Sequence, residues 1–266
     1  DLLDHVMHED VVTFTGSAST GRMLKRHDRL IDESVPFNME ADSLNAIVLG
    51  PDAVPGTEEF DLFIKEVTRE ITLKCGQRCT GARRIMVPQN VLEDVQIALG
   101  KRLGSTVIGD PRAEGVRMGA LAGKAQREEV KRSLAELMKG SKVVYGNPDS
   151  VDVTGADAAK GAFMSPILLL NTDPWKNQVS HNVEAFGPVS TLMPYKDLDD
   201  AVALSKLGKG SLVATIATHN PQYAQQFVWG AASHHGRMLV LDRDMAKENT
   251  GHGSPLATLV HGGPGR

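Results

Sequence analysis

Short extended apolar segments alternate with helical patterns along almost the whole chain, and this alternation limits the possible folds more than any other feature. Extended segments lie at residues 11–14, 45–49 and 84–87, and others surround Val143, Leu168, Thr191, Val213 and Val240. Strands that alternate with helices in this way predict an α/β protein whose strands are largely parallel.

The predicted helices place their apolar residues on one face. One stripe consists of Phe60, Phe63, Ile64, Val67 and Ile71, and a second of Val91, Val95, Leu99 and Leu103. This is the spacing of an amphipathic helix packed on a core. Further helices are expected at residues 18–26 and 197–207, and after Asn220, a capping residue followed by proline. Residues 146–161 are predicted to form a polar surface loop rather than a linker.

Composition restricts the expected partners. The chain has 266 residues, 41% of them hydrophobic, which is enough for one large or two smaller globular domains. A formal net charge of −4 gives no electrostatic reason to expect nucleic acid or an anionic membrane as a partner. No apolar run is long enough to cross a bilayer, and the first residues show no signal peptide. Because the chain starts at Asp1 without a methionine, we expect the natural protein to begin upstream.

The chain contains only two cysteines, Cys75 and Cys79. Two are too few for a disulfide framework, and no second Cys/His pair completes a zinc site. We therefore expect a cytoplasmic protein without a bound metal. His234, His235 and His252 are not spaced as metal ligands and are expected to lie in turns or at the surface.

Cys79 lies in the segment Lys-Cys-Gly-Gln-Arg-Cys-Thr, residues 74–80, between a predicted helix and a predicted strand. A turn that contains glycine can expose a thiol and leave its backbone N–H free to stabilise an oxyanion. Nearby cations would favour the thiolate, which is the nucleophilic form. The candidates are Lys74, Arg78, Arg83 and Arg84. The alternative is a small hydrophobe packed in the core, and local composition leaves both possibilities open.

Three further segments could take part in chemistry. Glu40 ends an apolar extended segment, where burial would raise the pKa of its carboxyl towards that of a general base; the alternative is a surface glutamate. Gly16 and Ser17 lie between a strand and a helix, where backbone N–H groups can hold a phosphate, although most such turns bind nothing. Glu184 and Phe186 could contact a ribose diol and a flat ring, or could form a strand-entry turn with a buried phenylalanine.

The order of four motifs resembles that of the aldehyde dehydrogenase superfamily. The motifs are Phe-Thr-Gly-Ser at residues 14–17, a glutamate after a strand at Glu40, Gly-Gln-x-Cys-Thr at residues 76–80 and Glu-x-Phe-Gly-Pro at residues 184–188. The resemblance implies an NAD(P)-dependent oxidoreductase with Cys79 as nucleophile and Glu40 as general base. The cofactor, NADP or NAD, would contact Gly16, Ser17, Glu184 and Phe186.

The resemblance also implies a domain organisation. Residues 1–73 would be the carboxyl-terminal part of a Rossmann-type dinucleotide-binding domain, and residues 74–266 the α/β catalytic domain with a closing loop segment. The family's oxyanion-hole asparagine, its lysine for the adenosine ribose and a strand pair used in oligomer formation precede this region, so none can be placed on the chain. A homo-oligomer is implied for the full-length protein, and the isolated chain is expected to be inactive.

A narrower resemblance rests on residues 39–45, Met-Glu-Ala-Asp-Ser-Leu-Asn, where most of the superfamily has Gly-Gly-Lys. Together with residues 184–188, 250–255 and 261–266, this segment resembles the dehydrogenase part of bifunctional phenylacetate-degradation proteins. Semialdehyde dehydrogenases of aerobic benzoyl-CoA breakdown are the nearest alternative. Both imply a CoA-linked semialdehyde from aromatic ring cleavage as the small-molecule substrate. Both are described as preferring NADP, a preference that nothing in the sequence shows.

Three functions remain in competition. The first is a hydrolytic dehydrogenase, in which water activated by Glu40 releases the acid. The second is an acylating dehydrogenase that passes the thioester to CoA, for which a water-activating base is of little use. The third is a truncated, non-catalytic module that folds without a complete cofactor site.

Overall fold

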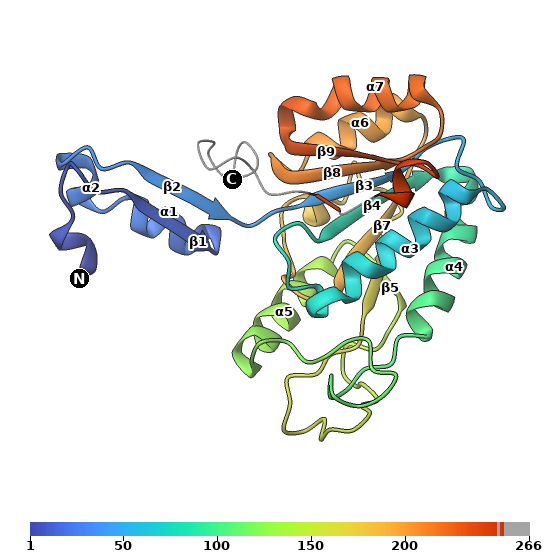
Figure 1. Ribbon diagram of the computed structural model, residues 1–266, viewed down its shortest axis with the longest axis horizontal. Coiled ribbons are helices and arrows are strands. Elements are labelled where there is room, and N and C mark those ends of the chain that lie inside the picture. Colours follow the sequence, from blue (N-terminus) through green and yellow to red (C-terminus); the bar gives the residue numbers. More distant parts are fainter. Residues whose placement is uncertain (249–250, 253–266) are drawn as a thin grey trace.

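The computed structural model describes residues 1–248 and 251–252, which form a small amino-terminal lobe joined to a larger body (Figure 1). The lobe consists of a 3-10 helix (Leu2–His5), β1 (Val12–Gly16), α1 (Ala18–Lys25), α2 (Asp28–Asp32) and β2 (Phe37–Ala41). β1 and β2 form a two-stranded parallel sheet, in which Thr15 lies opposite Glu40. The fold therefore makes neighbours of two segments that carry expected site residues.

The larger body is built on one seven-stranded sheet. Its strands, in spatial order, are β5 (Lys142–Tyr145), β6 (Ile167–Leu170), β7 (Val189–Tyr195), β4 (Ala82–Pro88), β3 (Asn45–Leu49), β8 (Ser211–Ala217) and β9 (His235–Leu241). All neighbouring strands are parallel except β5 and β6, which pair antiparallel. The predicted α/β fold with a largely parallel sheet is confirmed.

Helices cover both faces of this sheet. α3 (Glu58–Thr72) and α4 (Leu92–Gly104) pack on one face, α6 (Leu198–Lys206) and α7 (Pro221–Ala231) on the other, and α5 (Lys124–Leu137) packs near β6 (Figure 1). Short 3-10 helices lie at Leu73–Gly76, Gln89–Val91, Gln178–His181, Ala232–His234 and Met245–Lys247. Both predicted apolar stripes are buried: the one from Phe60 to Ile71 on α3, and the one from Val91 to Leu103 at and along α4.

The central strand β3 illustrates why its sequence is apolar throughout. Ile47 and Leu49 belong to the core beneath α3 and α4, whereas Ala46 and Val48 belong to the core beneath α6 and α7. Successive side chains of a strand point to opposite faces, so a strand covered on both sides needs an unbroken apolar run. Asn45, the first residue of β3, is the polar exception in this buried strand.

The domain boundary expected after residue 73 does not match the observed sheets. β3 and α3 both precede residue 73, yet β3 is a central strand of the large sheet and α3 packs against that sheet. The division between lobe and body instead falls in residues 42–44, between β2 and β3. Sequence alone placed β3 and α3 with the strand and helix before them, because an α/β alternation looks the same on both sides of a domain boundary.

Other expectations can be compared directly with the structure. Residues 146–161 form no helix or strand, as predicted for a surface loop. Over residues 1–248 and 251–252, no helix has both the length and the apolar character needed to cross a membrane. The narrower sequence resemblance rests partly on residues 250–255 and 261–266. All of these except 251 and 252 lie outside the described residues.

Candidate active site

The expected site residues meet at the amino ends of the central strands. Cys79 lies three residues before β4, Phe186 lies three residues before β7, and the link from Glu40 leads into β3. In open parallel sheets, ligands usually bind at the carboxyl ends of the strands. The site of this chain lies at the opposite edge, beside the link to the small lobe.

The turn that carries Cys79 has an unusual backbone. α3 ends at Thr72, and Lys74, Cys75 and Gly76 follow with positive φ angles of 53°, 54° and 68°. A Cβ on Gly76 would overlap the backbone carbonyl of Gly187. Glycine is therefore needed where the cysteine turn passes the Phe-Gly-Pro segment.

The two thiols lie in different surroundings. Cys79 is exposed, whereas Cys75 is buried and burial raises the pKa of its thiol to about 12. Burial also raises the pKa of Cys79, and the nearby Glu40 carboxylate raises it further by its charge and by a hydrogen bond with the thiol. Backbone N–H groups of Thr80 and Cys79 act in the opposite direction. The Glu40 carboxylate thus lies near enough to influence the Cys79 thiol, although the two residues come from different parts of the fold.

The expected effect of the neighbouring cations on Cys79 is wrong, because its thiol pKa is raised. The Arg84 guanidinium is buried and donates to the carbonyls of Leu204 and Ser205. Arg78 Nη1 lies 2.6 Å from Glu70 Oε1 in an ion pair. Arg83 is turned inwards, and Lys74 is exposed at the surface. Position in the sequence did not indicate where these side chains point.

Asn45 ties the cysteine turn to the sheet and was missed by the sequence analysis. Its Nδ2 donates to the backbone carbonyls of Cys79 at 2.8 Å and Gly81 at 2.9 Å. Its Oδ1 accepts from Ser43 Oγ at 2.7 Å and from the backbone N–H of Val213 at 3.0 Å. The buried amide thereby uses two donors and two acceptors to join the turn to β3 and β8. A polar residue at the start of an otherwise apolar strand was the available signal.

Glu184 is buried and already has protein partners. Its Oε2 accepts from the backbone N–H of Ser43 at 2.9 Å, and its Oε1 from Arg83 Nε at 3.1 Å. Burial raises the pKa of this carboxyl despite Arg83. The Phe186 ring is 42% exposed and lies 5.4 Å from the Arg83 guanidinium carbon. The alternative of a buried phenylalanine is therefore excluded, and the ring offers a surface beside the site.

Gly16 and Ser17 lie where β1 gives way to α1, as predicted. The Ser17 hydroxyl caps the helix by accepting from the Thr20 N–H at 3.2 Å. The N–H of Ala18 donates to Asp42 Oδ1 at 3.1 Å. A carboxylate of the chain itself therefore occupies part of the helix terminus at which a phosphate was expected, and the Asp42 contact was not anticipated.

These residues fit one end of a dinucleotide. An exposed aromatic ring, a buried carboxylate and a helix amino terminus surround the edge of the sheet at which Cys79 and Glu40 meet. No described segment adds further strands to β1 and β2, whose sheet has only two strands. Among the described side chains, no group of three or more His, Cys, Asp or Glu is placed to hold a metal ion.

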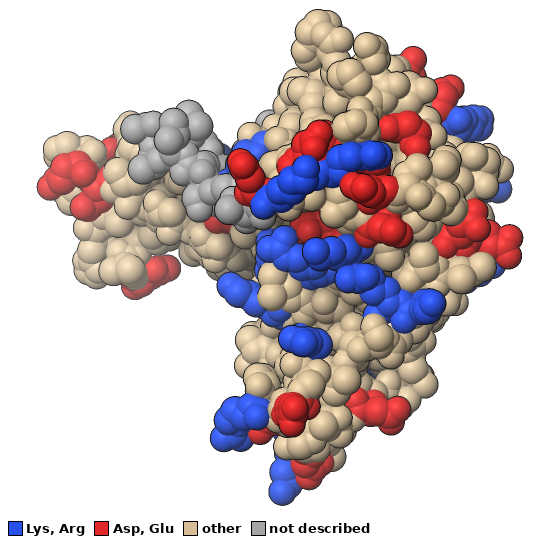
Figure 2. Space-filling view, turned by 45° about the vertical axis from the view of Figure 1, so that its right-hand side comes forward, with Lys and Arg blue, Asp and Glu red and all other residues tan. Residues whose placement is uncertain are grey.

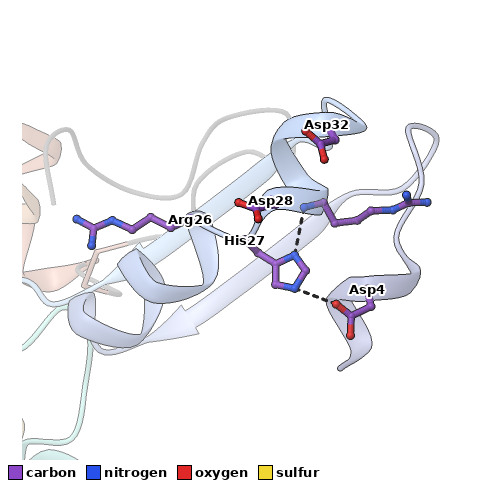
Figure 3. A pocket seen from close by; sticks show the side chains of 6 residues that line it. Asp4, Arg26, His27, Asp28 and Asp32 are labelled. Atoms are coloured by element: carbon purple, nitrogen blue, oxygen red, sulfur yellow. Dashed lines mark hydrogen bonds and ion pairs between the residues drawn. The ribbon is translucent and has the colours of Figure 1, made fainter.

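An open hollow of about 490 Å³ lies elsewhere, on the small lobe (Figure 3). Its lining consists of Asp4, Arg26, His27, Asp28, Arg29 and Asp32. His27 bridges it, with Nε2 3.2 Å from Asp4 and Nδ1 accepting from the N–H of Arg29. None of the expected site residues lines this hollow.

Acidic and basic side chains lie side by side on the face of the molecule shown in Figure 2.

Comparison with known sequences gives the family. The pattern of the aldehyde dehydrogenase family matches residues 2–243. A 3,4-dehydroadipyl-CoA semialdehyde dehydrogenase from Aromatoleum evansii is 45% identical over 264 residues, which is 99% of this chain and 51% of that protein. Protein MaoC of Klebsiella aerogenes is 44% identical over 150 residues, 56% of this chain and 43% of that protein. The chain thus spans about half the length of the curated relatives that it matches.

Solved structures agree in fold. Betaine aldehyde dehydrogenase from Staphylococcus aureus in complex with NAD⁺ superposes with a TM-score of 0.80 at 19% identity, covering 96% of this chain and 46% of that one. An aldehyde dehydrogenase C variant from Pseudomonas syringae, with NAD⁺ and octanal, gives 0.79 at 22% identity, covering 96% and 48%. The sequence match over most of its length and this shared fold together establish that the chain belongs to the aldehyde dehydrogenase family.

Proposed function

We propose that this chain carries the catalytic part of an NAD(P)-dependent aldehyde dehydrogenase that oxidises a CoA-linked semialdehyde to the acid, with Cys79 as nucleophile. The observation that carries the proposal is the proximity of the Glu40 carboxylate, from the small lobe, to an exposed Cys79 in the larger body. A thiol needs a base to become a nucleophile at neutral pH, and a thioester needs a base to activate the water that hydrolyses it.

The proposed reaction has two stages at Cys79. Glu40 accepts the thiol proton, and the thiolate attacks the aldehyde carbon to give a thiohemiacetal, whose oxyanion the backbone N–H groups near Cys79 are placed to stabilise. When bound, NAD(P)⁺ would supply the acceptor for a hydride, and loss of this hydride from the adduct leaves a thioester on Cys79. Glu40 releases this first proton to solvent and then removes a proton from water, which attacks the thioester. The acid leaves, and Glu40 returns the second proton to the Cys79 thiolate, which restores the thiol.

We assign the cofactor contacts to the nicotinamide side of the site. Phe186 offers its exposed face to a flat ring. Each oxygen of Glu184 accepts one hydrogen bond in the described structure, and a carboxylate oxygen can accept about two, so a ribose diol can still bind there. Gly16 and Ser17 lie at the α1 terminus, where a phosphate would displace Asp42. We place the dinucleotide-binding part in the small lobe, up to residue 41, and the catalytic part from residue 45 onwards.

The substrate class rests on the relative that is 45% identical over almost the whole chain and is described as a CoA-semialdehyde dehydrogenase. Phenylacetate and benzoyl-CoA breakdown both supply aldehydes of this class, and we keep both as sources.

We further propose a homo-oligomeric full-length protein, by family resemblance, and a cytoplasmic location, since a catalytic thiol must stay reduced. The contact of Glu40 with Cys79 supports hydrolysis over transfer to CoA. A non-catalytic module remains the alternative for the chain in isolation.

The proposal is tested by cysteine exchange in the intact enzyme that contains this chain. Cys79→Ser should abolish semialdehyde-dependent reduction of NADP⁺ and NAD⁺, because a serine hydroxyl at this position is not a comparable nucleophile. Cys75→Ser is the matched control and should retain activity, since Cys75 lies in the core. Full activity of Cys79→Ser would refute the assignment.

A further inference from the structure

Arg83 contacts two segments of the site and has no role in the mechanism above. It is 4% exposed. Its Nη2 donates to the carbonyls of Gly76 at 2.9 Å and Arg78 at 3.3 Å, both in the cysteine turn. Its Nη1 donates to the carbonyl of Gly187 at 2.9 Å, and its Nε to Glu184 Oε1 at 3.1 Å. Every nitrogen of the guanidinium therefore donates to a residue beside the site.

We propose that Arg83 is a positioning residue that fixes the Cys79 turn against the Glu184–Gly187 segment. The proposal rests on the function assigned above, since it gives Arg83 a purpose only if Cys79 is the nucleophile. The turn needs stabilising hydrogen bonds because Lys74 and Cys75 have positive φ angles, which residues with a Cβ rarely adopt. Close contact between Gly76 and Gly187 brings the two segments together, and Arg83 bonds to both.

Only the forked shape of arginine suits this position. A guanidinium presents five N–H donors in a fixed plane, so one side chain can reach four acceptors in different directions. A lysine ammonium could pair with Glu184 but could not also hold the carbonyls of Gly76, Arg78 and Gly187. Arg83→Lys should therefore keep the ion pair with Glu184 but lose the hydrogen bonds that hold the turn. It separates the effect of the charge from the effect of positioning.

The ionisation of Cys79 reports the position of the turn. Burial and contact with Glu40 raise the pKa of the Cys79 thiol, so a turn that moves outwards lets this pKa fall towards the ordinary value of about 8.5. A purely electrostatic role for Arg83 predicts the reverse, because removing a cation raises the pKa of a thiol. The direction of the change thus distinguishes a positioning residue from a nearby charge.

The experiment measures the rate of Cys79 alkylation by iodoacetamide in the intact enzyme that contains this chain, from about pH 6 to about pH 10, resolved by peptide mass spectrometry. Arg83→Lys and Arg83→Gln are compared with the parent chain and with Arg127→Lys as control. Arg127 also donates to a backbone carbonyl, that of Gly161, but lies outside the site. Thermal unfolding is recorded for each variant.

Arg83→Lys should lower the apparent pKa of Cys79 and speed its alkylation roughly threefold to tenfold near pH 8, while the control titrates like the parent. An unchanged or raised pKa in Arg83→Lys would overturn the positioning role, whatever its unfolding temperature. If Arg83→Gln does not fold, Arg83→Lys alone decides. The alkylation rate does not depend on dehydrogenase activity. The positioning role of Arg83 can therefore be refuted while the Cys79→Ser test supports the proposed function, and the proposed function can be refuted while the alkylation result is as expected.

Discussion

At the scale of single residues, the reactivity of Cys79 depends on neighbours that act in opposite directions. Burial and the Glu40 carboxylate keep the thiol protonated, whereas the backbone N–H groups of Thr80 and Cys79 stabilise the thiolate. The arginines near it in sequence contribute little, since Arg78 is paired with Glu70 and Arg84 is buried under α6. In the proposed mechanism, Cys79 therefore rests mainly as a thiol, and transfer of its proton to Glu40 raises the share of nucleophilic thiolate.

This balance predicts the effect of Glu40→Gln on the Cys79 thiol of the intact enzyme. Removing the carboxylate charge should lower the pKa of Cys79, so alkylation below that pKa should be faster, by roughly threefold to tenfold near pH 8. The rate advantage should disappear at pH values where the thiol is fully ionised in both chains. Iodoacetamide labelling followed by peptide mass spectrometry measures it. Glu129→Gln, at an exposed position on α5, should change nothing. A slower reaction in Glu40→Gln would contradict the contact.

At the scale of elements, the site depends on close packing between turns at one edge of the sheet. Gly76 touches the Gly187 backbone, and the N–H of Ala122 donates to Gln77 Oε1 at 2.8 Å. The Asn45 side chain donates hydrogen bonds to the backbone carbonyls of Cys79 and Gly81. The turns that carry the motifs are thus held in place partly by contacts between their backbones. Glycine permits this close approach, and amide side chains bond the backbone groups beside Cys79.

Gly76→Ala and Gly56→Ala form a matched pair that tests this packing. Both glycines have positive φ, 68° and 93°, but a Cβ on Gly56 has nothing within 4 Å. Gly56→Ala should cost about 1–2 kcal/mol of unfolding free energy, the usual penalty for a Cβ in this region. Gly76→Ala should cost at least about 3 kcal/mol, because the Gly187 backbone must also move. Urea denaturation gives both values. Equal losses would show that the contact between the two turns is not tight.

At the scale of the whole molecule, the α/β class and the buried helix faces could be predicted from the sequence, because apolar periodicity is a local signal. The strand at residues 45–49 and the helix stripe from Phe60 to Ile71 appear where they were expected. Which sheet β3 joins could not be predicted, since strand pairing is decided by contacts between distant segments. For the same reason the inward turn of Arg83 and the hydrogen bonds of Asp42 and Asn45 were not foreseen.

The arrangement of the two parts also bears on activity. Glu40 comes from the small lobe and Cys79 from the larger body, so the proposed mechanism requires the lobe to be held against the edge of the sheet. β1 and β2 form a sheet of only two strands, which is marginal by itself. We accordingly expect the isolated chain to retain a reactive Cys79 but to lack dehydrogenase activity, and we expect turnover only in the intact enzyme.

If Glu40 is the base that releases the acyl group from Cys79, that acyl group should accumulate when the base is removed. In the intact enzyme, Glu40→Gln should still attack the aldehyde and reduce one equivalent of cofactor, but hydrolysis should stall. Steady-state turnover should fall roughly 10²–10⁴-fold, as for a lost general base. Mass spectrometry after a single turnover should then find the acyl group on the Cys79 peptide. Normal turnover in Glu40→Gln, or acylation at Cys75 instead, would contradict the account.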